Sequence, residues 1–207
     1  MALRVTALVI LSLVFLFAHS LGAYAGEPSD QVRSSVDKVL DILKNKELNK
    51  PAKMEARRAA MRSAVGERFD FEEMSKRTLA LHWQKRTPDE KKEFVSLFSN
   101  LLERSYSNKI ETYTDEKILY GEETVDGEYG VVKTKIITGR NVEIPIDYKL
   151  FRKGPQWMVY DVVIEGVSLV NNYRNQFNKV IRTKSYEELV KRLRNKQEEV
   201  LFDEKRK

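Results

Sequence analysis

The chain has 207 residues, which is long enough for one domain with a sizeable hydrophobic core. It contains no cysteine, and this excludes disulfides, thiol catalysis and thiolate metal sites. Its 37 basic and 31 acidic side chains alternate along the sequence, so no nucleic-acid-binding stripe stands out and we expect no nucleic-acid partner. The formal net charge of +6 could favour an anionic lipid surface or an acidic partner, or serve solubility alone.

Residues 1–25 have the pattern of a cleaved secretory signal peptide. Arg4 provides a positive charge, Val5 to Ala18 form an apolar segment, and Ala23-Tyr24-Ala25 is an A-x-A cleavage site before Gly26. The alternative is an uncleaved membrane anchor, but the apolar segment is shorter than the ~20 residues that a spanning helix needs. We therefore expect export, and removal of the signal leaves 36 basic against 31 acidic residues and a net charge of +5.

Capping residues and helical spacing predict three helices in the first third of the mature chain. We expect an amphipathic helix from Ser29-Asp30 to about Asn45, a second from Pro51 to Gly66, and a short third opened by the Asp70/Glu73 capping box.

Thr87-Pro88-Asp89-Glu90 is the sharpest helix start in the sequence, with a cap, a proline in the first turn and a glutamate three residues after the cap. About 26 residues follow without a helix breaker, or roughly 39 Å. They carry a wide apolar and aromatic stripe that could cover a sheet.

From Asp115 the hydrophobic period changes to two, and four strands follow with short turns between them. We expect strands at Lys117–Val125, Tyr129–Thr138, Val142–Leu150 and Trp157–Glu165. Strict alternation places Val159, Asp161 and Val163 on one face of the last strand. Pro145 cannot donate a ladder hydrogen bond, so the third strand is expected to be bulged or at an edge there. The pattern predicts a four-stranded antiparallel meander whose apolar face is covered by helices, an α+β fold.

Ser168 can cap a further helix, and Ser185 with Glu188 begins another that continues into a heavily charged end. We predict one domain at residues 26–190 and a charged helix or tail at 191–207.

The sequence offers few residues that could carry out catalysis. The mature chain has one histidine, His82, and the sequence has no nucleophile elbow, phosphate loop or metal-ligand spacing. Asp161 and Glu165 would lie about 13 Å apart on one strand face, too far to share a substrate atom. We expect Asp161 to pair with Arg174 or to accept hydrogen bonds at the strand-to-helix corner. Its use as a general base is the enzyme alternative.

Several motifs in order resemble the MlaC family, also called toluene-tolerance auxiliary proteins. They comprise Phe69-Asp70, Leu81-His82-Trp83, a helix with Phe94, Phe98, Leu101-Leu102 and Tyr106, and the densest run: Trp157, Tyr160-Asp161, Glu165-Gly166-Val167-Ser168-Leu169 and Tyr173-Arg174. The resemblance implies an NTF2-like fold whose curved sheet and helices enclose an apolar cavity for phospholipid acyl chains, with no cofactor and no catalysis. It also implies a monomeric periplasmic carrier that shuttles phospholipid between an outer-membrane lipoprotein complex and an inner-membrane ABC transporter with an MCE-type substrate-binding subunit.

The residues expected to line such a cavity are apolar or aromatic and come from three places. From the long helix and the segment before it we expect Trp83 (at the mouth), Phe98, Leu102, Tyr106 and Ile110; from the sheet and its corner Ile144, Ile146, Tyr148, Val163 and Val167; and from the returning helix Tyr173 and Phe177. Each could instead fill a closed core, in which case the protein would be an interaction module that binds no lipid.

Overall fold

The structure is a computed structural model that describes residues 27–111 and 116–195. The predicted signal peptide and most of the predicted tail lie outside these ranges. No helix in the described residues is long and apolar enough to cross a membrane.

Six α-helices and five strands make up the described chain. In order they are α1 (Pro28–Lys44), α2 (Met54–Gly66) after a 3-10 turn (Pro51–Lys53), α3 (Phe71–Leu79), a second 3-10 turn (Ala80–Lys85), α4 (Pro88–Glu111), β1 (Lys117–Asp126), β2 (Tyr129–Ile137), β3 (Glu143–Lys153), β4 (Gln156–Ile164), β5 (Val167–Ser168), α5 (Leu169–Thr183) and α6 (Tyr186–Arg194). The strands form one sheet in the order β1-β2-β3-β4-β5, and all of its pairs are antiparallel. The antiparallel meander is confirmed, but it has a fifth, two-residue strand that was not predicted.

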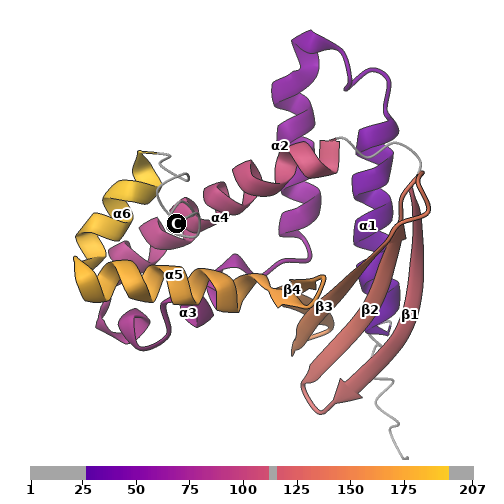
Figure 1. The fold of residues 1–207 in the computed structure, drawn as a ribbon. Coiled ribbons are helices and arrows are strands. Elements are labelled where there is room, and N and C mark those ends of the chain that lie inside the picture. The colour runs from indigo at the N-terminus through magenta and orange to yellow at the C-terminus, as the bar shows by residue number, and fades with distance from the viewer. Residues whose placement is uncertain (1–26, 112–115, 196–207) are drawn as a thin grey trace, which may run out of the picture.

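The helices form two groups joined by α4. Figure 1 shows α1 and α2 beside the curved sheet, while α3, α5 and α6 gather at the other end of the molecule. The helix α4 starts within the second group and ends close to α2. The long helix can therefore contribute side chains to both groups.

Most helix starts follow the predicted capping chemistry. At α4 the backbone N–H of Thr87 donates to Glu90 Oε2 at 2.7 Å, and the N–H of Glu90 donates to Thr87 Oγ1 at 3.2 Å. Ser168 and Ser185 accept from the N–H groups of Asn171 and Glu188. These signals are local, so the sequence alone reveals them.

The start of α1 differs from the prediction. The helix begins at Pro28, one residue before Ser29, and has no side-chain cap. Ser29 instead donates from its N–H to Glu123 of β1 at 2.6 Å, and from its hydroxyl to the same carboxylate oxygen. A tertiary contact across 94 residues thus replaces the expected local cap and ties α1 to the sheet.

The chain packs into two hydrophobic clusters. The helical cluster comprises Met74, Leu79, Trp83, Phe94, Phe98, Leu101, Leu102, Val170, Tyr173, Phe177, Val180, Tyr186, Leu189, Val190 and Leu193. The sheet cluster comprises Val32, Val132, Leu150, Trp157, Val159, Val162 and Leu169. Leu193, near the end of α6, is only 2% exposed, so the helical cluster continues past residue 190.

Gly130 lies where α1 and β4 pack against β2. A Cβ atom there would lie 3.4 Å from the Trp157 ring and 3.5 Å from the Pro28 ring. The N–H of Trp157 donates to Gln31 Oε1 at 3.0 Å, which fixes α1 against the start of β4.

Two irregularities in the sheet change what the alternation predicts. Lys149 pairs with Asp161 while Leu150 pairs with Val159, so Tyr160 is an extra, bulged residue in β4. Pro145 causes no bulge, because the register between β2 and β3 is continuous there. Pro145 lies on β3, an inner strand, and its C=O accepts from the N–H of Glu165, just past the end of β4, at 3.0 Å. The expected bulge or edge position is therefore wrong.

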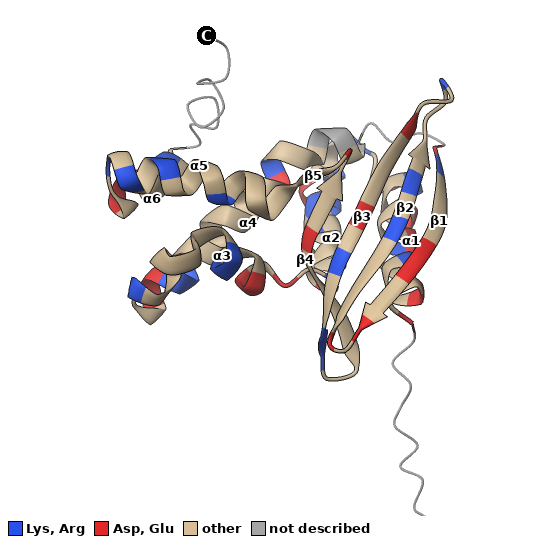
Figure 2. Cartoon of the chain, turned by 60° about the horizontal axis from the view of Figure 1, so that its bottom comes forward, with Lys and Arg blue, Asp and Glu red and all other residues tan. Residues whose placement is uncertain are grey.

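Charges of both signs are mixed over the sheet and the helices (Figure 2). Cross-strand pairs such as Lys133–Glu122 (2.7 Å) and Lys135–Glu143 (2.8 Å) place opposite charges side by side on exposed strand positions. This face therefore offers no single-sign surface for a polyanion.

Candidate functional site

The inner face of the sheet, the face that α1 covers, is organised in rows of directly opposed residues. The first row is Ile118, Ile136 and Ile144, and the second is Tyr120, Thr134, Ile146 and Ile164. The third row is Glu123, Val132, Tyr148 and Val162, and the fourth is Val125, Gly130, Leu150 and Val159.

On β2, β3 and β4 burial increases from the first row to the fourth, whereas Val125 on the edge strand β1 is 46% exposed. All three isoleucines of the first row are half-buried, and so are Tyr120, Ile146 and Ile164 of the second. In the fourth row Leu150 and Val159 are 0% and 1% exposed, under Val32 and Trp157. One end of the sheet is thus a closed core, and the other end keeps an apolar surface that protein atoms cover only in part.

We call this partly covered area the inner apolar surface. On the sheet it consists of Ile118, Tyr120, Ile136, Ile144, Ile146, Tyr148 and Ile164. We add Val36 of α1 and Tyr106 of α4, which pack against the sheet cluster. Three predicted lining residues, Ile144, Ile146 and Tyr148, lie on it.

Tyr106 is the predicted helix residue that reaches both clusters, because it packs against the helical cluster and against the sheet cluster. Ile110 follows one turn later on α4 and is half-buried. Through Tyr106, α4 reaches the sheet cluster, and a contact of Ile110 with the inner apolar surface stays a prediction.

The structure separates two predicted lining residues from this surface. The bulge at Tyr160 places Val159, Val162 and Ile164 on the inner face, so Val163 faces the opposite side, opposite Asp147. Val167 lies in β5 beyond the corner and is 56% exposed. Strict alternation was wrong here because a bulge reverses the face of every residue after it.

Five predicted lining residues lie inside the helical cluster: Trp83, Phe98, Leu102, Tyr173 and Phe177. Phe98 is fully buried, and its ring centroid lies 5.3 Å from that of Tyr173 and 5.6 Å from that of Phe177. Trp83, expected at a mouth, is 8% exposed, with Lys91 Nζ 5.5 Å from its ring centroid. In the structure these side chains pack against one another, and a contact with lipid stays a prediction.

The sequence reading missed five positions: Ile118, Tyr120, Ile136 and Ile164 on the sheet, and Val36 on α1. Their signal was present, since Ile118 and Tyr120 alternate with exposed Lys117 and Leu119 along β1. The bulge between Tyr120 and Glu123 ends this pattern early and weakens the period-two signal of the strand.

Tyrosine hydroxyls are the polar groups that stand out on the inner apolar surface. Burial raises the pKa of Tyr148 to about 12. Burial and the nearby charge of Asp37 raise the pKa of Tyr120 to about 12, although the Arg33 guanidinium, 4.0 Å from the centroid of its ring, opposes the shift. Both phenols therefore stay protonated, and each can donate a hydrogen bond at any physiological pH.

Asp161 stabilises the corner between β4 and α5. Its Oδ2 accepts from Ser168 Oγ at 2.7 Å, and its Oδ1 accepts from the N–H of Val170 at 3.0 Å. Lys149 Nζ lies 3.7 Å from Oδ2. The expected role at the strand-to-helix corner is confirmed, but the expected pairing with Arg174 is wrong.

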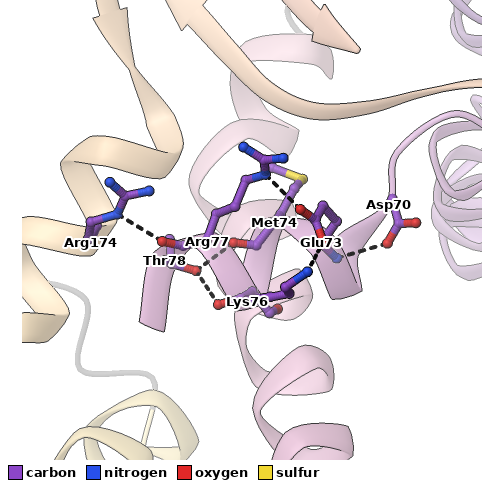
Figure 3. Close-up of polar contacts among 8 residues, drawn as sticks. Asp70, Glu73, Met74, Lys76, Arg77, Thr78 and Arg174 are labelled. Carbon is purple, nitrogen blue, oxygen red and sulfur yellow. Dashed lines mark hydrogen bonds and ion pairs between the residues drawn. The ribbon is translucent and has the colours of Figure 1, made fainter. Parts of the chain in front are cut away.

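Arg174 instead holds α5 to the end of α3, as Figure 3 shows. Its Nε donates to the C=O of Arg77 at 2.8 Å, a carbonyl in the last turn of α3 that has no partner within the helix. Arg77 is fixed by Glu73 (2.9 Å), which also pairs with Lys76. This network joins α3 and α5 away from the inner apolar surface.

Two further polar features, a histidine contact and a hollow, lie away from the inner apolar surface. His82 Nε2 lies 3.1 Å from Asn178 Oδ1, a contact that supports its structural interpretation. A hollow of about 360 Å³ lies between α4 and α6, lined by Glu90, Glu93, Tyr186, Glu187, Val190, Lys191, Arg194 and Asn195. This mostly charged lining does not suit an acyl chain.

Comparisons with known proteins agree with one another. The family model described as MlaC protein matches residues 33–195. Toluene tolerance protein ttg2D of Pseudomonas putida is 28% identical over 169 residues, 80% of this chain and 78% of its own length. The intermembrane phospholipid transport system binding protein MlaC of Haemophilus influenzae is 22% identical over 129 residues, 60% of each chain.

A solved structure has the same fold. The phospholipid-binding protein from Ralstonia solanacearum, in complex with a phospholipid, superposes with a TM-score of 0.69 at 23% identity. The match covers 82% of this chain and 96% of that protein.

Proposed function

The chain belongs to the MlaC family, and we propose that it is a phospholipid carrier whose acyl chains lie against the inner apolar surface. The observation that carries this proposal is the gradient of burial along the sheet, from fully packed at Leu150 and Val159 to half-covered at Ile118, Ile136 and Ile144. What supports a binding role is that these isoleucines form contiguous rows with Tyr120, Ile146 and Tyr148, an apolar surface that protein atoms cover only in part.

The energetics of carrying lipid explain why the surface must be apolar. Each CH₂ group buried from water gains ~0.8 kcal/mol, so two long acyl chains correspond to on the order of 20 kcal/mol. A lipid that leaves a bilayer loses this stabilisation, and the carrier has to replace most of it. A continuous apolar surface on β1, β2 and β3, under α1 and the end of α4, can do so with few polar contacts.

The proposal includes the setting of transport. We propose that the protein works in the periplasm as a monomer and exchanges phospholipid with an outer-membrane lipoprotein complex and with an inner-membrane ABC transporter that has an MCE-type substrate-binding subunit. The names of the relatives support this setting, because one of them is called a binding protein of an intermembrane phospholipid transport system.

The geometry gives less support to the two alternatives. A general base at Asp161 would have to give up hydrogen bonds from Ser168 and Val170, and it faces away from the inner apolar surface. An interaction module with a closed core fits the helical cluster, but it does not explain the half-buried rows of the sheet.

The first test is native mass spectrometry of the mature chain purified without detergent, with organic extraction and lipid analysis of the same sample. We expect about one phospholipid per chain. A chain that carries no lipid, and takes none from vesicles, would rule out the carrier function. Delivery is tested separately, by following labelled phospholipid from the loaded protein to membranes with and without the reconstituted transporter.

A further inference from the structure

The hydroxyl of Tyr120 lies buried within the apolar layer without a hydrogen-bond partner among the described residues. The ring belongs to the second row of the inner apolar surface, directly opposite Thr134 and beside Ile118 and Ile136 of the first row. Unpaired buried hydroxyls are rare in folded proteins, because losing water without gaining a partner is unfavourable.

Neighbouring groups do not satisfy this hydroxyl. Thr134 donates its own hydroxyl to the C=O of Ile146 at 2.8 Å. Arg33 lies 4.0 Å from the centroid of the Tyr120 ring, and a guanidinium has no acceptor atom. Because its pKa is raised to about 12, the phenol keeps its proton and remains a donor.

The ring that carries this donor is held in place. Arg33 of α1 stacks on it, and one turn earlier the N–H of Ser29 donates to Glu123, three residues further along β1. A fixed donor on an otherwise apolar surface distinguishes a ligand that has an acceptor oxygen from a pure hydrocarbon.

We propose that the Tyr120 hydroxyl donates a hydrogen bond to an oxygen at the glycerol end of the bound phospholipid and so fixes how deeply the lipid sits. This inference rests on the proposed function. The acceptor is an ester carbonyl, where the acyl chains join the glycerol, or a phosphate oxygen next to it. The acyl chains then extend over the isoleucines, and the polar group beyond the phosphate is left outside the site.

The test compares wild type with Tyr120→Phe, and uses Tyr129→Phe as a matched control because Tyr129 is an exposed tyrosine on the neighbouring strand, 51% accessible. The delipidated proteins are loaded from vesicles of diacyl phosphatidylglycerol or of its dialkyl ether analogue, which lacks the carbonyls. Bound lipid is counted by native mass spectrometry, and thermal unfolding is followed with and without lipid.

We expect Tyr120→Phe to bind diacyl lipid about five- to tenfold more weakly, the usual effect of one hydrogen bond. Its lipid-free form should unfold at the same or a higher temperature than wild type. Weakening with the diacyl lipid alone assigns the acceptor to the carbonyl, and weakening with both lipids assigns it to the phosphate.

Unchanged binding of both lipids by Tyr120→Phe would overturn this inference and leave the carrier function standing. Failure of wild type itself to bind either lipid would instead contradict the carrier function. A lower unfolding temperature of lipid-free Tyr120→Phe, with unchanged binding, would show that the hydroxyl serves the fold.

Discussion

Lys153 at the end of β3 and Asp70 at the start of α3 form an ion pair, with Nζ 2.8 Å from Oδ2, although 83 residues separate them. The other oxygen of Asp70 accepts from the N–H of Glu73 at 2.9 Å and caps α3. The backbone N–H of Asp70 donates to the C=O of Val159 in β4 at 3.0 Å. One residue thus starts a helix and joins it to two strands of the sheet.

This arrangement predicts how stability depends on pH. Burial acts to raise the pKa of Asp70, but hydrogen bonds from Lys153 and from the N–H of Glu73 outweigh it, and the net pKa is lowered from 3.8. A carboxylate with a lower pKa in the folded state stabilises the protein above its unfolded pKa, and this contribution is lost as pH falls through the folded value.

We therefore expect Asp70→Asn, which keeps a capping oxygen but loses the charge, to lower the free energy of unfolding at pH 7 by about 1 kcal/mol. The difference from wild type should shrink below about pH 4. Urea unfolding between pH 3 and pH 7 measures both. A constant difference across that range would show that the charge of Asp70 does not contribute.

Ile144 and Leu119 provide a matched pair for the lipid surface, since they lie on opposite faces of the sheet. Ile144→Asp places a charge on the half-buried first row, whereas Leu119→Asp changes a side chain that is 50% exposed. We expect the first to reduce bound phospholipid at least about tenfold, because an unpaired carboxylate is costly against acyl chains. The second should leave lipid content unchanged. Native mass spectrometry gives both values, and equal lipid content in the two folded variants would place the site elsewhere.

A substitution at Phe98 tests whether this predicted lining residue belongs to the packed core instead. The side chain is fully buried among Phe94, Tyr173 and Phe177. Phe98→Ala is therefore expected to lower the free energy of unfolding by about 3–5 kcal/mol, while Tyr129→Ala on the exposed face should cost less than about 1 kcal/mol. Denaturant unfolding measures the difference. A Phe98→Ala protein of normal stability that had lost its lipid would restore Phe98 to the binding surface.

Asp161 tests the corner of the fold. Asp161→Ala removes two buried hydrogen bonds at the start of α5, and we expect a loss of about 2–4 kcal/mol in the free energy of unfolding. Glu165→Gln, at an exposed carboxylate four residues later, is the control and should have little effect. If Asp161→Ala remained fully stable but lost an enzymatic turnover, the enzyme alternative would have to be reconsidered.

Features that depend on interactions between neighbouring residues could be predicted before the structure was known. The caps at Thr87, Ser168 and Ser185, the order of helices and strands, and the antiparallel meander could all be read from the sequence. Each follows from hydrogen bonds within a few residues or from a periodicity of two or 3.6, and both are local properties of the chain.

Which apolar residues are left half-covered depends on packing between elements that are distant in the sequence. A bulge at Tyr160 moved Val163 to the opposite face, and packing among helices from distant parts of the chain buried Phe98 and Phe177 completely. A side chain in a closed core and one on a partly covered surface can have the same residue type and the same spacing. They differ in how many groups from other elements reach them, and that depends on where the folded chain brings those elements.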